Sequence, residues 1–145
     1  MKVEQVKITE VGPRDGFQSE RTILKTEDKI DVINNLTDAG FQRIEVSSFV
    51  SPKAIPQLAD AAMILENVKR NPKTTLAALV PNAKGALRAV DAKLDEIVVF
   101  LSASESHNKT NVNRSIKESL IEFKDISDIA VKNNIPVQGD IATAF

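Results

Sequence analysis

RIEVSSF, residues 43 to 49, is the stretch that decides between the two folds the chain allows. Apolar Ile44 and Val46 alternate with polar Glu45 and Ser47, which predicts a strand with two unlike faces. Interior strands of a doubly wound sheet carry helices on both faces and are apolar throughout. A carboxylate without a partner would be costly inside such a helix layer. In a (β/α)8 barrel, the inner face near the C-terminal mouth accepts such polar side chains.

Predicted strands and helices alternate along the whole chain, as in the βα units of a parallel sheet. The predicted strands lie near residues 6–10, 43–49, 74–80, 96–102 and 136–142, and the predicted helices near 26–39, 56–70, 84–92 and 115–133. We expect Thr26 to cap the first helix and Gly40 to end it. Ser115 and Glu118 have the S-x-x-E spacing of a capping box.

The composition is that of one ordinary globular domain. The chain has 145 residues, 42% of them hydrophobic and 27% charged, with a formal net charge of −1. Without a block of Lys and Arg we expect no nucleic-acid partner, and without an apolar run of about 20 residues no membrane span. The absence of cysteine excludes disulfides and thiolate metal sites within these residues. Because MKVEQVKITEV enters a strand pattern at once, we expect no targeting segment and a cytoplasmic protein.

Polar residues gather after the predicted strands, at the edge where a barrel carries its catalytic face. They are Arg14, Asp15, Gln18, Ser47, Ser48, Asn82, Ser102, Ser104 and Glu105. This layout favours an α/β fold of the (β/α)8 TIM-barrel type, with an open doubly wound sheet as the alternative. A complete barrel takes about 250 residues. Residues 1–145 therefore predict about the first four βα units plus strand five, the N-terminal part of a single barrel domain.

Arg14 and Asp15 form the sharpest candidate pair. An arginine and a carboxylate at the end of a strand can together orient a substrate oxygen and bind a cation. The alternative is a structural or solvated ion pair. If Glu45 faces inward, we expect it to pair with Arg14 across adjacent strands and to fix the guanidinium. The alternative for Glu45 is a buried salt bridge with no further role.

The stretch SASESHNKTNVN, residues 102 to 113, has the composition of a polar loop rich in hydroxyl and amide groups. Lys109, Asn111 and Asn113 either hold a phosphate or carboxylate there or are only solvated. His107, the single histidine of the chain, is expected to be a surface residue rather than a catalyst or a ligand. The GxGxxG, Walker A, HExxH and GxSxG patterns are absent.

Several motifs, in order, resemble one enzyme family. EVGPRDGFQSE (10–20), IEVSSFVSPKAIPQLAD (44–60), VPNAKG (80–85) and SASESHNKTNVNRSI (102–116) are similar to the N-terminal half of the 3-hydroxy-3-methylglutaryl-CoA lyases. These lyases belong to a larger family of metal-dependent barrels that includes the isopropylmalate and homocitrate synthases. The chain resembles the synthases only around its RDG triplet. The resemblance to the lyases runs from about Val6 to the end of the chain.

The resemblance implies a carbon–carbon lyase that cleaves 3-hydroxy-3-methylglutaryl-CoA to acetyl-CoA and acetoacetate, as in leucine degradation. By position, Asp15 resembles a ligand of the family's divalent metal, Mg²⁺ or Mn²⁺. Arg14 resembles the arginine that stabilises the enolate oxygen, and Glu45 resembles the glutamate that positions this machinery. The substrate-binding candidates are Gln18, Ser48 and Asn111.

The resemblance also places required groups outside this chain. The family's other metal ligands, a His-x-His pair and an asparagine, lie in the second half of the barrel, as does its catalytic cysteine. We therefore expect the isolated 145-residue chain to be inactive, and the complete enzyme to be a homodimer that acts on an acyl-CoA. The alternatives are a lyase or synthase of this family with a related 3-hydroxyacyl-CoA substrate, and a non-catalytic half-barrel acting as an assembly module. The open edges of a half-barrel should make it dimerise or aggregate.

Strand five departs from the lyase pattern. VQGDIATAF, residues 137 to 145, stands where the lyases show an arginine-glycine-tyrosine segment. Gln138 and Asp140 thus replace an arginine and an aromatic residue. If Asp140 points inward, it adds a negative charge near Asp15, which leaves open which acyl-CoA is preferred.

Overall fold

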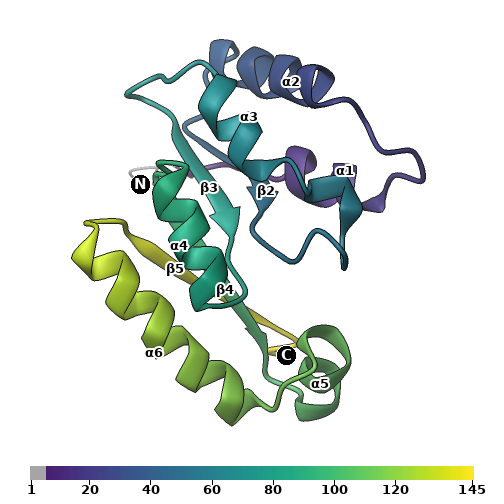
Figure 1. Cartoon of the computed structure of the whole chain (residues 1–145), viewed down its shortest axis with the longest axis vertical. Helices are drawn as coiled ribbons and strands as arrows, with labels where there is room; N and C mark the ends of the chain where they lie inside the picture. The colour runs from purple at the N-terminus through teal and green to yellow at the C-terminus, as the bar shows by residue number, and fades with distance from the viewer. Residues whose placement is uncertain (1–5) are drawn as a thin grey trace, which may run out of the picture.

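Five parallel strands form one sheet in the computed structural model, which describes residues 6–145. Their spatial order follows the sequence, β1-β2-β3-β4-β5. The strands are β1 (Thr9–Glu10), β2 (Arg43–Ser48), β3 (Thr75–Leu79), β4 (Glu96–Ser102) and β5 (Val137–Ala142). The sheet curls like part of a barrel wall, with the C-terminus beside the C-terminal end of β4 (Figure 1).

The helices between successive strands pack against one face of this sheet (Figure 1). The longer ones are α2 (Thr26–Asp38), α3 (Ala61–Asn67), α4 (Ala83–Asp91) and α6 (Ile116–Lys132). Short helical turns occur at η1 (Gly12–Gly16), α1 (Phe17–Ser19) and η2 (Pro56–Leu58), and α5 spans Glu105–Val112. The core between sheet and helices contains Ile44, Leu76 and Ile97 from the strands and Ile33, Ile64, Ala89 and Ile126 from the helices. The opposite, concave face of the sheet is left for the inside of a barrel.

This topology confirms the predicted TIM-barrel type and overturns the doubly wound alternative. In a doubly wound sheet the strand order reverses at a switch point, and helices cover both faces. Here each crossover leads to the next strand in the same direction, and all strand pairs are parallel. The described residues therefore form a curled half-barrel.

Several local predictions are confirmed. The fourth strand has the predicted bounds, Glu96–Ser102. Gly40 follows the end of α2 with φ of +92°, the left-handed conformation that favours glycine at this position. Ser115 and Glu118 form the predicted capping box at the start of α6, with both reciprocal hydrogen bonds present.

Two predictions about helix ends are wrong. Lys25, not Thr26, is the N-cap of α2, and no side chain caps this helix. The Thr26 hydroxyl instead donates to the Asp60 carboxylate at 2.9 Å. This contact with a residue outside the helix replaces the capping bond that was expected. The helix predicted over 56–70 is divided into η2 and α3, and it ends where Val68 becomes extended.

A β-bulge in β2 corrects the predicted facing of RIEVSSF. Glu45 pairs with Ala77 of β3, but Ser47 pairs with Ala78 and Ser48 with Leu79, so the register shifts by one residue after Glu45. A bulge of this kind inserts one extra residue and reverses the alternation beyond it. Ser48, rather than Ser47, therefore shares the inner face with Glu45. The buried Ser47 hydroxyl has no hydrogen-bond partner within the part of the chain that the structure describes.

A polar network fastens the inner face at the N-terminal ends of the strands. Arg43 of β2 donates from Nε to Glu96 of β4 at 2.9 Å and from Nη1 to Thr9 of β1 at 3.1 Å. The Arg43–Glu96 ion pair crosses β3, and with the Thr9 contact Arg43 joins β1, β2 and β4. This end of the sheet is occupied by an internal ion pair, which leaves the C-terminal end for a ligand.

The two outer edges of the sheet are apolar and exposed. Val6 and Ile8, predicted to lie in the first strand, precede β1 and are 85% and 66% exposed. Ile141 on β5 is 62% exposed. The expected strand pattern at residues 1–5 lies outside the described residues. Within residues 6–145, β1 and β5 each pair with one strand, and no helix is long and apolar enough to cross a membrane.

Candidate active site

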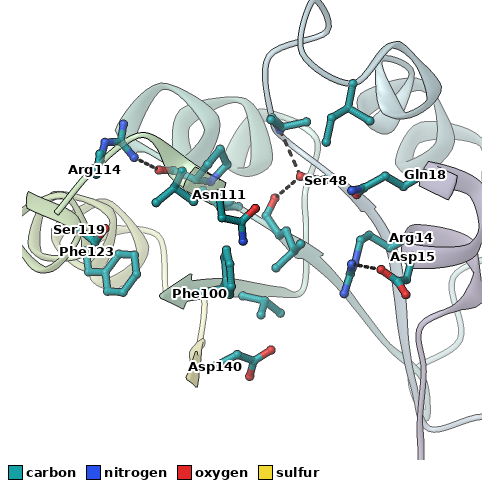
Figure 2. Close-up of a pocket in the computed structure, with 17 residues that line it drawn as sticks. Arg14, Asp15, Gln18, Ser48, Phe100, Asn111, Arg114, Ser119, Phe123 and Asp140 are labelled. Carbon is teal, nitrogen blue, oxygen red and sulfur yellow. Dashed lines mark hydrogen bonds and ion pairs between the residues drawn. The ribbon is translucent and has the colours of Figure 1, made fainter. Parts of the chain in front are cut away.

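A cavity of about 370 Å³ lies at the C-terminal ends of the strands, on the concave side of the sheet (Figure 2). Its apolar wall includes Leu79, Val98 and Phe100 of β3 and β4. Its polar lining consists of Arg14, Asp15, Gln18, Ser48, Asn111, Arg114, Ser119 and Asp140. The cavity thus joins segments from both halves of the chain, at the end where TIM-barrel enzymes hold their catalytic groups.

A tight turn places Arg14 and Asp15 at the end of β1. The backbone N–H groups of both residues donate to the carbonyl of Val11, at 3.0 and 2.8 Å. The N–H of Gly12 donates to the Glu10 carboxylate at 2.6 Å. A Cβ at position 12 would lie 2.8 Å from that same oxygen, so a larger residue there would displace the Glu10 carboxylate from this contact. The GPRDG segment therefore forms a π-type turn, which sequence periodicity did not predict.

Arg14 is held between two carboxylates. Its Nε donates to Glu45 of β2, whose side chain is only 4% exposed, and its Nη1 donates to Asp15 at 2.7 Å. This confirms the predicted pairing of Arg14 with Glu45 across adjacent strands. The fork geometry fixes the plane of the guanidinium. No hydrogen bond occupies its Nη2 within residues 6–145, so this nitrogen is available to a ligand.

Ser48 and Gln18 form the neighbouring part of the wall. The Ser48 hydroxyl donates to the Leu79 carbonyl at 3.4 Å and accepts from the Val50 N–H at 3.3 Å. It therefore shapes the start of the loop after β2. Gln18 lies on α1, one turn beyond Asp15, and its side chain borders the cavity (Figure 2).

The loop after β2 is anchored from behind by a buried lysine. Lys29 of α2 is 1% exposed and donates to both Asp60 oxygens at 2.9 Å and to the Gln57 carbonyl at 2.6 Å. These bonds tie α2 to η2 and to the start of α3. Ile55, just before η2, lines the cavity, so Lys29 fixes one wall without touching it.

Asn111 reaches the cavity from a helix, not from the predicted loop. Residues 105–112 form α5, which begins at Ser104, whose hydroxyl accepts from the His107 N–H. The fully buried Asn108 holds this helix: it accepts from the Ser102 N–H at 2.9 Å and donates to the Arg114 carbonyl and the Ser119 hydroxyl, both at 2.9 Å. Sequence reasoning missed both Asn108 and the cavity-lining Arg114.

Asp140 projects into the cavity from β5, opposite Arg14 and Asp15 (Figure 2). It is aligned with Phe100 of β4, and its Oδ1 accepts from the Gln138 side chain at 2.8 Å. Asp140 therefore points inward, as considered from the sequence.

The structure brings most, but not all, of the proposed site residues together. Arg14, Asp15, Gln18, Ser48 and Asn111 line one cavity, with Glu45 directly behind Arg14. Four other polar residues that follow the strands make local structural contacts instead. Asn82 caps α4, Ser102 bonds to Thr143, Ser104 caps α5 and Glu105 accepts from the Ile116 N–H. His107 is exposed and does not line the cavity.

Asp15 is the residue best suited to bind a cation. Its side chain is 65% exposed on the cavity wall, and only its Oδ1 is occupied, by Arg14, within residues 6–145. Hard divalent ions take carboxylate oxygens of this kind. The described residues contain no group of three His, Cys, Asp or Glu side chains that could hold a metal ion. Asp15 thus offers one unengaged carboxylate oxygen at the cavity, and the described residues do not surround it with further carboxylate or imidazole groups.

The whole chain is similar to one family of proteins. The HMGL-like family model matches residues 5–144. The cytoplasmic 3-hydroxy-3-methylglutaryl-CoA lyase of Rattus norvegicus is 46% identical over 98% of this chain and 41% of its own length. The chain therefore spans less than half the length of this curated relative.

Solved structures agree with the curled half-barrel. The HMG-CoA lyase of Bacillus subtilis superposes with a TM-score of 0.95 at 44% identity, over 99% of this chain and 48% of its own. An HMG-CoA lyase from Acinetobacter baumannii, solved in complex with coenzyme A and 3-methylmalate, superposes with a TM-score of 0.90 at 43% identity. That match covers 94% of this chain and 45% of the Acinetobacter chain.

Proposed function

The chain belongs to the HMGL-like family, and from this premise we propose that it supplies one side of an acyl-CoA lyase active site. The reaction is cleavage of 3-hydroxy-3-methylglutaryl-CoA to acetyl-CoA and acetoacetate. The observation that carries the proposal is the Arg14 guanidinium, fixed by Glu45 and Asp15 at the mouth of a half-barrel cavity. The relatives that share this fold carry lyase names.

Arg14 acts on the charge that develops during bond cleavage. The C3 hydroxyl proton leaves to a base, the C2–C3 bond breaks, and its electron pair forms a thioester enolate that is then protonated at C2. Arg14 lines the cavity, and its Nη2, which has no hydrogen bond within residues 6–145, can donate to the enolate oxygen. Because that charge exists only after cleavage begins, this bond favours the transition state over the substrate. Glu45 keeps the donor in place before the reaction, so little reorganisation is required.

Asp15 would hold a divalent metal ion, Mg²⁺ or Mn²⁺, together with ligands outside residues 6–145. When bound, such an ion polarises hydroxyl and carboxylate oxygens of the substrate. Members of this family are metal-dependent lyases. The support for Asp15 as the ligand is that its carboxylate is exposed and that Arg14 engages only its Oδ1.

Gln18, Ser48 and Asn111 would bind the acyl-CoA. They border the same cavity from α1, β2 and α5, and each offers a neutral polar group. A cytoplasmic location and a role in leucine degradation remain predictions, since one relative is named as a mitochondrial enzyme. A homodimer of the complete enzyme also remains a prediction.

A chimeric barrel tests the proposed function. Residues 1–145 are joined to the part of the Bacillus subtilis lyase that follows its matched segment, because the two half-barrels superpose with a TM-score of 0.95. With Mg²⁺ or Mn²⁺ and 3-hydroxy-3-methylglutaryl-CoA, we expect acetyl-CoA and acetoacetate in equal amounts. We expect Asp15→Asn to abolish turnover and any stabilisation of the chimera by the metal.

The control is Asp31→Asn, which removes an exposed carboxylate from α2, away from the cavity. It should leave turnover and metal stabilisation unchanged. A folded chimera that produces neither product would contradict the proposed function. Turnover that survives Asp15→Asn would remove this residue from the metal site.

A further inference from the structure

Asp140 is a cavity-lining carboxylate with no cation beside it. Its only hydrogen bond within residues 6–145 is the one its Oδ1 accepts from Gln138, and it takes part in no ion pair there. Its Oδ2 is therefore available to whatever occupies the cavity. An ionised carboxylate can only accept hydrogen bonds, so it selects for a donor.

The cavity as a whole favours neutral or donor groups near β5. Of the two cations in the lining, Arg14 is already matched by Glu45 and Asp15, and Arg114 pairs with Glu122 at 3.3 Å. Asp140 adds a negative charge that none of these cations neutralises. Asp140 lines the same cavity of about 370 Å³ in which an anionic group of the substrate would be held. Like charges in one cavity repel appreciably when they are partly shielded from water.

We propose that Asp140 shifts the acyl preference of this lyase site, so that besides the carboxylate substrate named above it takes a 3-hydroxyacyl-CoA whose far end carries a hydroxyl group. This inference rests on the proposed lyase function and refines its substrate class. A terminal hydroxyl donates a hydrogen bond to Asp140 Oδ2, whereas a terminal carboxylate would face it as a like charge. Sites that pair a polar substrate group discriminate strongly against an analogue that leaves the partner unpaired.

The chemistry is the same for both kinds of substrate. In 3,5-dihydroxy-3-methylpentanoyl-CoA, a CH₂OH group replaces the terminal carboxylate of 3-hydroxy-3-methylglutaryl-CoA. The C3 hydroxyl proton leaves to a base, the C2–C3 bond breaks, and C2 takes up a proton. The products are acetyl-CoA and 4-hydroxy-2-butanone, so the atoms balance and no oxidant or reductant is needed. The two thioesters therefore differ only at the group that would meet Asp140.

The test compares these two thioesters in the chimeric barrel described above. We measure kcat/KM for each and take the ratio of the dihydroxy substrate to the carboxylate substrate. Asp140→Asn keeps the shape of the side chain and removes its charge, and we expect it to lower that ratio about tenfold. Asp140→Ser, a smaller neutral variant, should lower it in the same direction. Asp125→Asn, an exposed α6 residue outside the cavity lining, serves as the matched control and should leave the ratio unchanged.

The outcomes separate this inference from the function on which it rests. A chimera that cleaves both thioesters with a ratio independent of residue 140 overturns the inference and leaves the lyase proposal standing. An equal fall of the ratio in Asp125→Asn would also overturn it, because the effect would then come from net charge. A folded chimera that cleaves neither thioester contradicts both proposals.

Discussion

Two carboxylates and the turn after β1 fix the position of Arg14, and its role depends on the fork shape of its guanidinium. Nε and Nη1 are engaged by Glu45 and Asp15, which leaves Nη2 to the cavity. Lysine carries the same charge, but its three N–H donors leave one freely rotating nitrogen and do not reproduce the planar fork that spans both carboxylates and presents a further donor. We expect Arg14→Lys in the chimeric barrel to lower kcat by about 10²–10³-fold.

Steady-state kinetics with 3-hydroxy-3-methylglutaryl-CoA provide the measurement, with Arg21→Lys as the control at an exposed position outside the cavity lining. KM should change little, because the donor acts mainly in the transition state. A rise in KM with an unchanged kcat would show that Arg14 binds the substrate without stabilising the enolate.

At the scale of residues, the sequence was sufficient for the Arg14–Glu45 pair but not for the serines. Alternation from Ile44 predicts an inward Glu45, and the strand order places it beside the turn that carries Arg14. The same alternation assigned Ser47 to that face, which is wrong. The bulge that turns Ser48 inward depends on pairing with β3, and no residue pattern in β2 reveals it.

Helix α6 illustrates an element whose stability depends on pH. The pKa of Glu118 is lowered by hydrogen bonds from the Ser115 backbone N–H and hydroxyl, with a smaller contribution from Lys109. A lowered pKa in the folded state means that the contribution to stability is complete above the ordinary value of 4.5 and is lost as the pH falls below it.

We therefore expect Glu118→Gln to lower the free energy of unfolding of the chimera at pH 7 and to have a progressively smaller effect towards pH 3. Urea unfolding at several pH values measures this difference. Ser115→Ala removes the cap itself and should cost about 1 kcal/mol at pH 7. A Glu118→Gln effect that grows with acidity would contradict the assigned sign.

The buried Lys29 connects α2 with the loop that forms one cavity wall. Lys29→Met would leave the Asp60 carboxylate, 17% exposed, without its cation, and we expect a destabilisation of about 3 kcal/mol in the chimera. The double variant Lys29→Met/Asp60→Leu removes both charges and should recover most of that loss. Urea unfolding compares the three proteins. If Lys29→Met were as stable as the parent, the Lys29–Asp60 ion pair would not stabilise this part of the fold.

Helix α5 is the element that sequence reasoning missed, and the reason is physical. Residues 105–112 contain no apolar repeat, so nothing in them predicts a helix. The helix is held from outside, by Ser104 at its start and by Asn108, whose partners lie in β4, α6 and the turn between. Elements stabilised by such tertiary bonds are predictable only when the fold is known.

At the scale of the whole molecule, the open sheet edges should govern solution behaviour. Val6, Ile8 and Ile141 are exposed at edges where β1 and β5 lack a second partner within residues 6–145. Such edges favour pairing with other chains. We expect the isolated 145-residue chain to associate as its concentration rises, and the chimera to do so less. Sedimentation velocity decides this, and a monomer at all concentrations would contradict an open half-barrel.

The fold class was predictable because it depends on features repeated along the chain. Each βα unit has its own alternating strand and amphipathic helix, and the polar ends of the strands indicate which edge carries the site. The non-catalytic assembly module remains the rival interpretation of the same half-barrel. The cavity that gathers Arg14, Asp15 and Asn111 favours the lyase, since a scaffold has no need of such a group.

Complementation between separate halves tests the central claim most directly. The 145-residue chain is mixed with the separately produced second half of the Bacillus subtilis lyase, in the presence of Mg²⁺ and 3-hydroxy-3-methylglutaryl-CoA. We predict no acetoacetate from either half alone and acetoacetate from the mixture, abolished by Asp15→Asn in this chain. Turnover by the 145-residue chain alone, or an inactive complex of the two halves, would contradict the account.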